Sequence, residues 1–394
     1  MTTAATLPNG ITVVVAPDAD EAIACVTTVH ATGYRDDPPD LQGLVHLVEH
    51  LLCRGDTVQG ATREDHVVVQ AFALPEDLPE ALEAHADRLR APVVDEASVR
   101  AHASLIAEET AALRRHPDFG FPWLPGARAV LGVDPLGDPG ALATADPARV
   151  RSFLHDHVRP DSTVVVVSGR VDSRHALALA EQHFRDLPAR TPRRPARSTR
   201  SKRSARRPPL RVDEARGAAL LWRVGGLSAD PHRTWAVWSA ARALVGGPRP
   251  VLLDLAADRG LPGRAVVSLG LVGTSWDAPS PTALCVGFLS PAPVAPPVLH
   301  DLLDTASLAV PRLVRDAAVV TAATEDLLLD ELALTDDPFV RARRIGLQVL
   351  RGGDPTLALD PTRRPRPGQR AQRDPVVSPG VPDGRRPVAH ARPR

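Results

Sequence analysis

A strongly basic segment at residues 190–211 divides this chain of 394 residues into two halves and so limits the folds open to it. The segment holds ten Lys or Arg residues and no acidic residue, together with several Pro and Ser. Because like charges and proline oppose packing, we predict an exposed linker. A nucleic-acid contact is the alternative, but no aromatic side chains are interleaved for base stacking, so we favour the linker.

The half before the linker is predicted to be mixed α and β. Alternating or short apolar runs indicate strands, and apolar residues three and four positions apart indicate helices. The predicted strands are Ile11–Val15, Ala22–Val29, Val67–Leu74 and Thr163–Ser168; the predicted helices are Asp40–Cys53, Glu80–Arg90, Glu96–Arg115, Pro147–His157 and Ser173–Phe184.

The half after the linker shows the same kinds of element. Its predicted strands are Ala218–Val224, Ala265–Leu269 and Ala283–Leu289; its predicted helices are Pro231–Leu244, Val251–Ala257, Val298–Ser307, Pro311–Leu334 and Pro338–Leu350. We predict an N-terminal domain at 1–189, a linker at 190–211, a similar domain at 212–353 and a disordered Pro/Arg-rich tail at 354–394. The tail contains too little apolar surface to offset the entropy of ordering it.

Composition narrows the class of protein. The formal net charge is zero, so no overall field draws the chain to nucleic acid or to a membrane. No apolar run approaches the ~20 residues that span a bilayer. The first ten residues, MTTAATLPNG, lack a basic region followed by an apolar one, so no secretory signal is predicted. Cys25, Cys53 and Cys285 are widely spaced and odd in number, which indicates a reducing compartment. We expect a cytoplasmic protein.

The predicted helix at 40–53 carries three ionisable side chains, His46, Glu49 and His50. Residues four apart lie on one helical face, so the two imidazoles can share one tetrahedral zinc ion. Glu49 reaches the same side, where it can take a proton from a zinc-bound water. An isolated motif of this length also recurs by chance as two ordinary histidines and a solvated acid. The apolar character of the rest of the helix favours the metal site.

A catalytic zinc site needs a third protein ligand and an open fourth position. The candidates are Glu108 and Glu109 on the predicted helix at 96–115. Glu109 lies near an apolar stripe that includes Leu105 and Ile106, so we expect it to point inward. An inward carboxylate is costly unless a metal or hydrogen bonds compensate.

Three stretches carry a resemblance to a known family. They are GYRDDPP at 33–39, GLVHLVEHLLCRGD at 43–56 and LIAEET at 105–110. Together they resemble the active-site segment and third-ligand helix of the pitrilysin/insulinase family, the inverzincins, whose motif reverses the H-E-x-x-H order. In that register Glu109, rather than Glu108, takes the ligand position.

The resemblance covers roughly residues 7–350 and is more specific in the first half. It implies an α+β fold of two homologous α/β domains, with mostly antiparallel mixed sheets and helices packed on one face, forming one half of a clam shell. It also implies one zinc ion per chain, held by His46, His50 and Glu109, and peptide-bond hydrolysis with Glu49 as the catalytic base. A peptide substrate follows from that activity.

The sequence departs from the family pattern at four places. Fewer residues than usual separate His50 from Glu109, with the shortening between Cys53 and Ala61. A further family acid, seven residues before the ligand glutamate, is replaced by His102. An Arg and a Tyr that grip substrate in the family correspond here to Ala256 and Gly263. The aromatic residue that usually follows the motif helix is Cys53, for which we expect a packing role.

The missing Arg and Tyr suggest a two-subunit enzyme. We expect a homologous subunit without zinc to supply them, so that a heterodimer is the active form and a homodimer is less favoured. The alternative is a non-catalytic scaffold or peptide-binding member of the family, which the departures at His102, Ala256 and Gly263 favour. A weaker reading makes the basic linker and tail an anchor for nucleic acid or acidic partners. The intact His46, Glu49 and His50 favour the peptidase.

Overall fold

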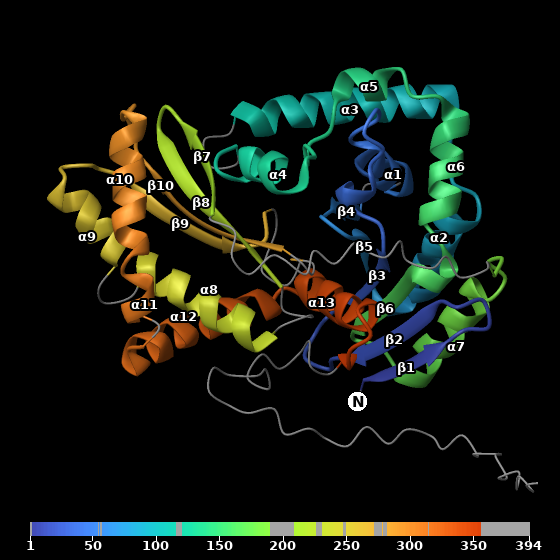
Figure 1. Cartoon of the computed structure of the whole chain (residues 1–394). Coiled ribbons are helices and arrows are strands. Elements are labelled where there is room, and N and C mark those ends of the chain that lie inside the picture. The colour runs from blue at the N-terminus through green and yellow to red at the C-terminus, as the bar shows by residue number, and fades with distance from the viewer. Residues whose placement is uncertain are drawn as a thin grey trace, which may run out of the picture.

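Two lobes, each built on one β-sheet, make up the chain (Figure 1). The computed structural model describes residues 2–53, 55, 57–115, 120–189, 209–225, 231–246, 250–271, 278, 282–313 and 315–355, without the side chains of residues 231, 232 and 331. Most of the predicted linker and tail, residues 190–208 and 356–394, lie outside these ranges. Among the described helices, none has the length and apolar character required to cross a membrane.

The first sheet has six strands in the order β1-β2-β6-β3-β5-β4. Its neighbouring strands are antiparallel, except that β2 and β6 are parallel. This order leaves β4 at one edge of the sheet. The strands are β1 (Thr3–Thr6), β2 (Thr12–Pro17), β3 (Ala24–His30), β4 (Val58–Thr62), β5 (Val67–Ala73) and β6 (Thr163–Gly169).

Helices cover one face of this sheet in two groups. Val165 and Val167 of β6 pack with α2 and α7, whereas Val67 and Val69 of β5 pack with α1, α3 and α6. The helices of this half of the chain are α1 (Leu44–Leu52), α2 (Leu78–Arg90), α3 (Glu96–Arg115), α4 (Trp123–Leu131), α5 (Pro139–Ala143), α6 (Pro147–His157) and α7 (Ser173–Phe184); short 3₁₀ turns occupy Tyr34–Asp36, Pro75–Asp77 and Pro160–Ser162.

The second sheet is a four-stranded antiparallel sheet in the order β7-β8-β10-β9. Its core joins Trp235, Leu252 and Leu299 to the strand residues Leu220 and Phe288. The elements are β7 (Leu210–Glu214), β8 (Gly217–Val224), α8 (Pro231–Val245), α9 (Val251–Asp258), β9 (Arg264–Leu269), β10 (Thr282–Leu289), α10 (Pro296–Ser307), α11 (Val310–Leu313), α12 (Ala317–Thr335) and α13 (Pro338–Leu350).

The two halves of the chain exchange helices. Ala342 and Ile345 of α13 pack on Val164 and Val166, on the face of the first sheet opposite α2 and α7. In return, Ala127 of α4 and its neighbours pack on β8 of the second sheet. The mixed α/β class is as predicted. The prediction placed helices on one face of each sheet only, whereas α13 and α4 pack on the sheet of the other half of the chain. The predicted domain boundaries stay predictions, since each half contributes a helix to the other's core.

Several helix boundaries differ from the predictions, and two of the differences have clear local reasons. The helix expected at 40–53 begins at Leu44, because the Asp37 carboxylate accepts the N–H groups of Gly43 and Val45 at 2.7 and 2.8 Å. The helix expected at 311–334 is divided between α11 and α12. Asp316 accepts the N–H groups of Ala318 and Val319, and it thereby starts a new helix. β1, β4, β7, α4 and α5 were not predicted, and β7 begins inside the predicted linker.

Two buried histidines make the stability of the first lobe depend on pH. Burial lowers the pKa of His30 to about 4, and burial together with Arg88 and His30 lowers that of His85 to about 3. An unfolded histidine has a pKa of about 6.5. The unfolded chain therefore binds more protons below that pH. The free energy of unfolding is therefore highest above pH ~6.5. It decreases as the pH falls toward 4, by up to ~1.4 kcal/mol per pH unit for each histidine.

Replacing His85 by Phe is expected to remove its share of this pH dependence. Neither ring nitrogen of His85 has a hydrogen-bond partner among the described residues, so the apolar ring breaks no such bond. Urea unfolding of wild type and variant, both zinc-free, checks this at pH 7 and pH 5. The variant should gain about 2 kcal/mol relative to wild type on acidification. An unchanged difference between the two pH values would contradict the assignment.

Candidate metal centre

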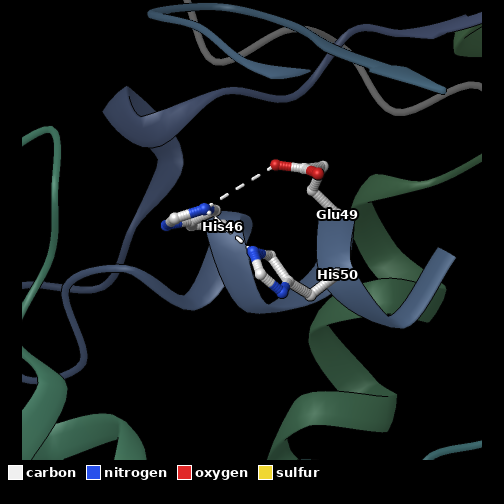
Figure 2. Close-up of side chains that lie close together, drawn as sticks. All are labelled: His46, Glu49 and His50. Carbon is white, nitrogen blue, oxygen red and sulfur yellow. Dashed lines mark hydrogen bonds and ion pairs between the residues drawn. The ribbon is translucent and has the colours of Figure 1, made fainter. Parts of the chain in front are cut away.

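Helix α1 presents His46, Glu49 and His50 on one side, while its leucines and valines are buried in the first lobe. Figure 2 shows the three side chains directed toward one another. The first turn of α1 is fixed by Asp37, which accepts two backbone N–H groups. Burial raises the pKa of Asp37 to about 6, despite these two donors. The apolar face of the helix therefore holds the polar face in a defined place.

Glu109 on α3 completes a group of three ligand atoms. The Nε2 atoms of His46 and His50 lie 3.2 Å apart, and Glu109 Oε2 lies 3.5 Å from each of them. Ligands about 2.0–2.1 Å from a tetrahedral zinc ion stand about 3.3–3.4 Å from one another. The three atoms are therefore spaced as three corners of a zinc tetrahedron, and the donor set of two imidazoles and a carboxylate suits zinc.

The charges around these atoms favour a cation between them. Hydrogen bonds from His46 and His50 hold the pKa of Glu109 far below its usual range. Burial lowers the pKa of His46, but the carboxylates of Glu109 and Glu49 outweigh it and raise the value. Each imidazole Nε2 can donate to Glu109 in one tautomer, and in the other tautomer it presents a lone pair. In the second case a cation between the three atoms would satisfy both lone pairs and the carboxylate at once.

Glu49 lies beside this group and outside it. Its Oε2 atom is 3.8 Å from His46 Nε2 and accepts a hydrogen bond of 3.2 Å from the hydroxyl of Thr62. Its Oε1 atom faces the thiol of Cys53 at 3.5 Å. The side chain is only 9% exposed. A carboxylate in this place is within reach of the metal position without being one of the three closest ligand atoms.

The remaining candidates of the first lobe have distinct positions. Of the adjacent glutamates, Glu109 contacts both imidazoles, and Glu108 is exposed on α3. His102 is half-buried, with its ring 5.9 Å from that of His50 in an edge-to-face arrangement. The expectation that Glu109 points inward from an apolar stripe is wrong: Leu105 is 51% exposed, and the Glu109 side chain is 46% exposed. Glu109 reaches α1 from a partly solvated surface.

The two positions that correspond to the substrate-gripping Arg and Tyr hold no donor. Ala256 is buried on α9 in the core of the second lobe. A Cβ atom on Gly263 would lie 2.3 Å from the carbonyl oxygen of Leu289 and 2.4 Å from the ring of Phe288, so this backbone has no room for a side chain. In Figure 1, α9 also lies at the far end of the molecule from α1. These two positions therefore supply neither donor to the site on α1.

Comparison with known proteins finds similarity to peptidases. A family model described as the Peptidase M16 inactive domain matches residues 144–268. An uncharacterized zinc protease of Streptomyces coelicolor is 28% identical over 270 residues, 61% of this chain and 58% of that protein. The chain is thus similar in sequence to M16 peptidases and to proteins named zinc proteases. The β subunit of the mitochondrial-processing peptidase of Blastocladiella emersonii is 23% identical over 261 residues, 61% of this chain and 56% of that subunit.

A solved structure shares the fold across nearly the whole chain. The crystal structure of a protease from Helicobacter pylori superposes with a TM-score of 0.75 over 91% of this chain and 92% of that one, at 14% identity. The sequence matches span little more than half the length of the two curated relatives. The match to the M16 inactive domain includes Ala256 and Gly263 and none of His46, Glu49, His50 and Glu109.

Proposed function

We propose that this chain is the zinc-carrying subunit of an endopeptidase that hydrolyses peptides or unfolded segments. The observation that carries the proposal is the set of three ligand atoms at 3.2–3.5 Å from one another, with the Glu49 carboxylate beside them. His46, His50 and Glu109 would hold one zinc ion. Relatives named zinc proteases support this choice of metal.

In this mechanism Glu49 acts as the general base and then as the general acid. A bound zinc ion supplies Lewis acidity, which polarises a peptide carbonyl and makes water acidic enough to act as a nucleophile near neutral pH. Glu49 accepts the proton of the attacking water and later delivers it to the nitrogen of the leaving amine. The Glu49 carboxylate is buried, lies 3.8 Å from His46 Nε2 and accepts a hydrogen bond from Thr62.

Strand β4 offers a place for the substrate. It is the edge strand of the first sheet, and Gln59 and Gly60 on it are exposed. Thr62, the last residue of the strand, contacts Glu49. An extended peptide that added to this edge by backbone hydrogen bonds would pass close to Glu49. A preference for extended, unfolded segments follows, with precursor or leader peptides as one source of them.

A homologous subunit without zinc is the proposed partner. A tetrahedral oxyanion needs donors aimed at it, and Ala256 and Gly263 supply none. The name of one relative, the β subunit of a processing peptidase, describes a protein that works as one subunit of several. We infer a heterodimer in which the partner carries the Arg and Tyr. All three cysteines lie in the described part of the chain and are unpaired, which supports a reducing, cytoplasmic setting.

Peptide hydrolysis with and without such a partner is expected to differ strongly. Losing one oxyanion donor costs about 10²–10³-fold in rate, so the zinc-loaded chain alone should cleave unstructured peptides at least ~10²-fold more slowly than its complex. The measurement is cleavage of a fluorogenic peptide library by the chain alone and co-expressed with a homologous subunit that carries Arg and Tyr at the corresponding positions. Equal activity of the chain as a monomer or homodimer would remove the need for the partner.

A non-catalytic scaffold or peptide-binding subunit is the second candidate, favoured by the absent donors at Ala256 and Gly263. In that case β4 would bind peptides without cleaving them. Binding of an uncleaved peptide by the zinc-loaded complex, with no product after prolonged incubation, would select this alternative.

A further inference from the structure

The Glu49 carboxylate is held by a strand that lies later in the sequence than α1. The hydroxyl of Thr62 donates to Glu49 Oε2 at 3.2 Å, and the thiol of Cys53 donates to Oε1 at 3.5 Å. Both oxygens of the carboxylate therefore have a donor. Cys53 lies one turn further along the same helix, so Thr62 is the donor that comes from another element.

Gly60, two residues before Thr62, leaves the space that the carboxylate fills. A Cβ atom at this position would lie 1.9 Å from Glu49 Oε1 and 2.4 Å from the sulfur of Cys53. Real Cβ atoms do not approach other atoms so closely, so any side chain here would displace Glu49. Strand β4 thus leaves room for the Glu49 carboxylate at Gly60 and donates a hydrogen bond to it from Thr62.

Strand β4 is an edge strand, yet its end is fixed on several sides. Thr62 pairs with Val67 of β5. In the turn that follows, the backbone carbonyls of Arg63 and Glu64 accept N–H groups from residues 34 and 35 at 2.9 and 3.1 Å. The Glu64 side chain pairs with Arg35 and accepts the N–H of Leu271 at the end of β9, in the second lobe. The turn that follows Thr62 is therefore held by both lobes.

We infer that Thr62 is a positioning residue for Glu49, which aims the carboxylate at the metal position through its hydroxyl while Gly60 keeps the space open. This inference rests on the proposed role of Glu49 as the base. A carboxylate that has lost its donor can rotate away from His46. A misplacement of about 1 Å at a reacting group can cost about 10²-fold in rate.

The test compares Thr62→Val, Thr62→Ser and Thr57→Val in the zinc-loaded complex. Val keeps the shape and removes the hydroxyl, Ser keeps the hydroxyl, and Thr57 is an exposed residue just before β4. We expect Thr62→Val to lower kcat about 10–100-fold with KM within about twofold. The kcat of Thr62→Ser should stay within about threefold of the wild-type value. The kcat of Thr57→Val should equal the wild-type value. Gly60→Ala should lower kcat at least as much as Thr62→Val.

A second readout does not depend on activity. In crystal structures of the zinc-loaded variants, the Glu49 carboxylate should keep its place in Thr62→Ser and turn away from His46 in Thr62→Val, with zinc content unchanged in both. An unmoved carboxylate in Thr62→Val, or a kcat equal to wild type, would overturn the inference. If wild type itself cleaves nothing, the proposed function fails, and the carboxylate position alone decides the role of Thr62.

Discussion

Replacing Glu49 by Gln is expected to lower the rate of peptide hydrolysis by about 10²–10⁴-fold while zinc stays bound. Gln has the shape of Glu and can still accept the hydrogen bond from Thr62, but it cannot take a proton from water at neutral pH. The three atoms closest to the metal position belong to His46, His50 and Glu109 and are unchanged. The measurement is kcat for a fluorogenic peptide, paired with zinc content by elemental analysis.

Glu108→Gln is the matched control for that experiment, because it makes the same chemical change at an exposed residue of α3. It should retain wild-type kcat. A Glu49→Gln variant that kept wild-type kcat would exclude Glu49 as the base, and an unchanged level of peptide binding without cleavage in either protein would favour the scaffold.

Replacing Glu109 by Ala is expected to weaken zinc binding by about 10²-fold or more. A residue that only orients a metal ligand already contributes about 10–100-fold to affinity, and Glu109 is placed as a ligand itself. Its side chain is 46% exposed and contacts the two histidines, so the fold should tolerate the change. Competition with a fluorescent zinc chelator measures the affinity of wild type and variant.

Glu108→Ala again serves as the control, since it removes the neighbouring carboxylate and its charge from the same helix. It should bind zinc as tightly as wild type does. Equal losses in Glu108→Ala and Glu109→Ala would mean that general negative charge, and no defined ligand, draws the metal.

The sequence predicted the metal helix because its evidence is local. His46 and His50 stand four apart in an otherwise apolar stretch, and helical geometry alone brings them together. Glu109 needed the family resemblance. The argument from burial chose the glutamate that the structure places beside both histidines, but its reason was wrong, because this carboxylate reaches them from a half-exposed position. The distance from Glu109 to the two histidines depends on how α1 packs against α3. Residue spacing in the sequence does not predict that packing.

Thr62 and Gly60 could not be predicted to act on Glu49. They matter only because β4 pairs with β5 and thereby lies beside α1, and β4 itself was not predicted. A glycine without positive φ in an edge strand gives no local signal that a carboxylate fills its missing side chain. The shortened stretch between Cys53 and Ala61 pointed to this region without saying what it contacts.

The packing of α4 and α13 on the sheet of the other half also could not be predicted from the sequence. Helix α4 lies between helices of the first half and packs on the second sheet, and α13 ends the second half and packs on the first sheet. A sequence pattern shows which face of a helix is apolar but not which sheet it meets. The predicted division into two similar units describes the order of the elements, and the packing joins those units through α4 and α13.

Zinc content is the most direct test of the whole account. The chain should be purified in native form without chelators or metal-affinity resin, and its metals counted by elemental analysis. X-ray data at the zinc edge would then locate the ion. The account predicts one zinc per chain, bound by His46, His50 and Glu109 and lost in Glu109→Ala. Protein that carries no zinc and takes none up when it is supplied, with those three side chains apart, would contradict it.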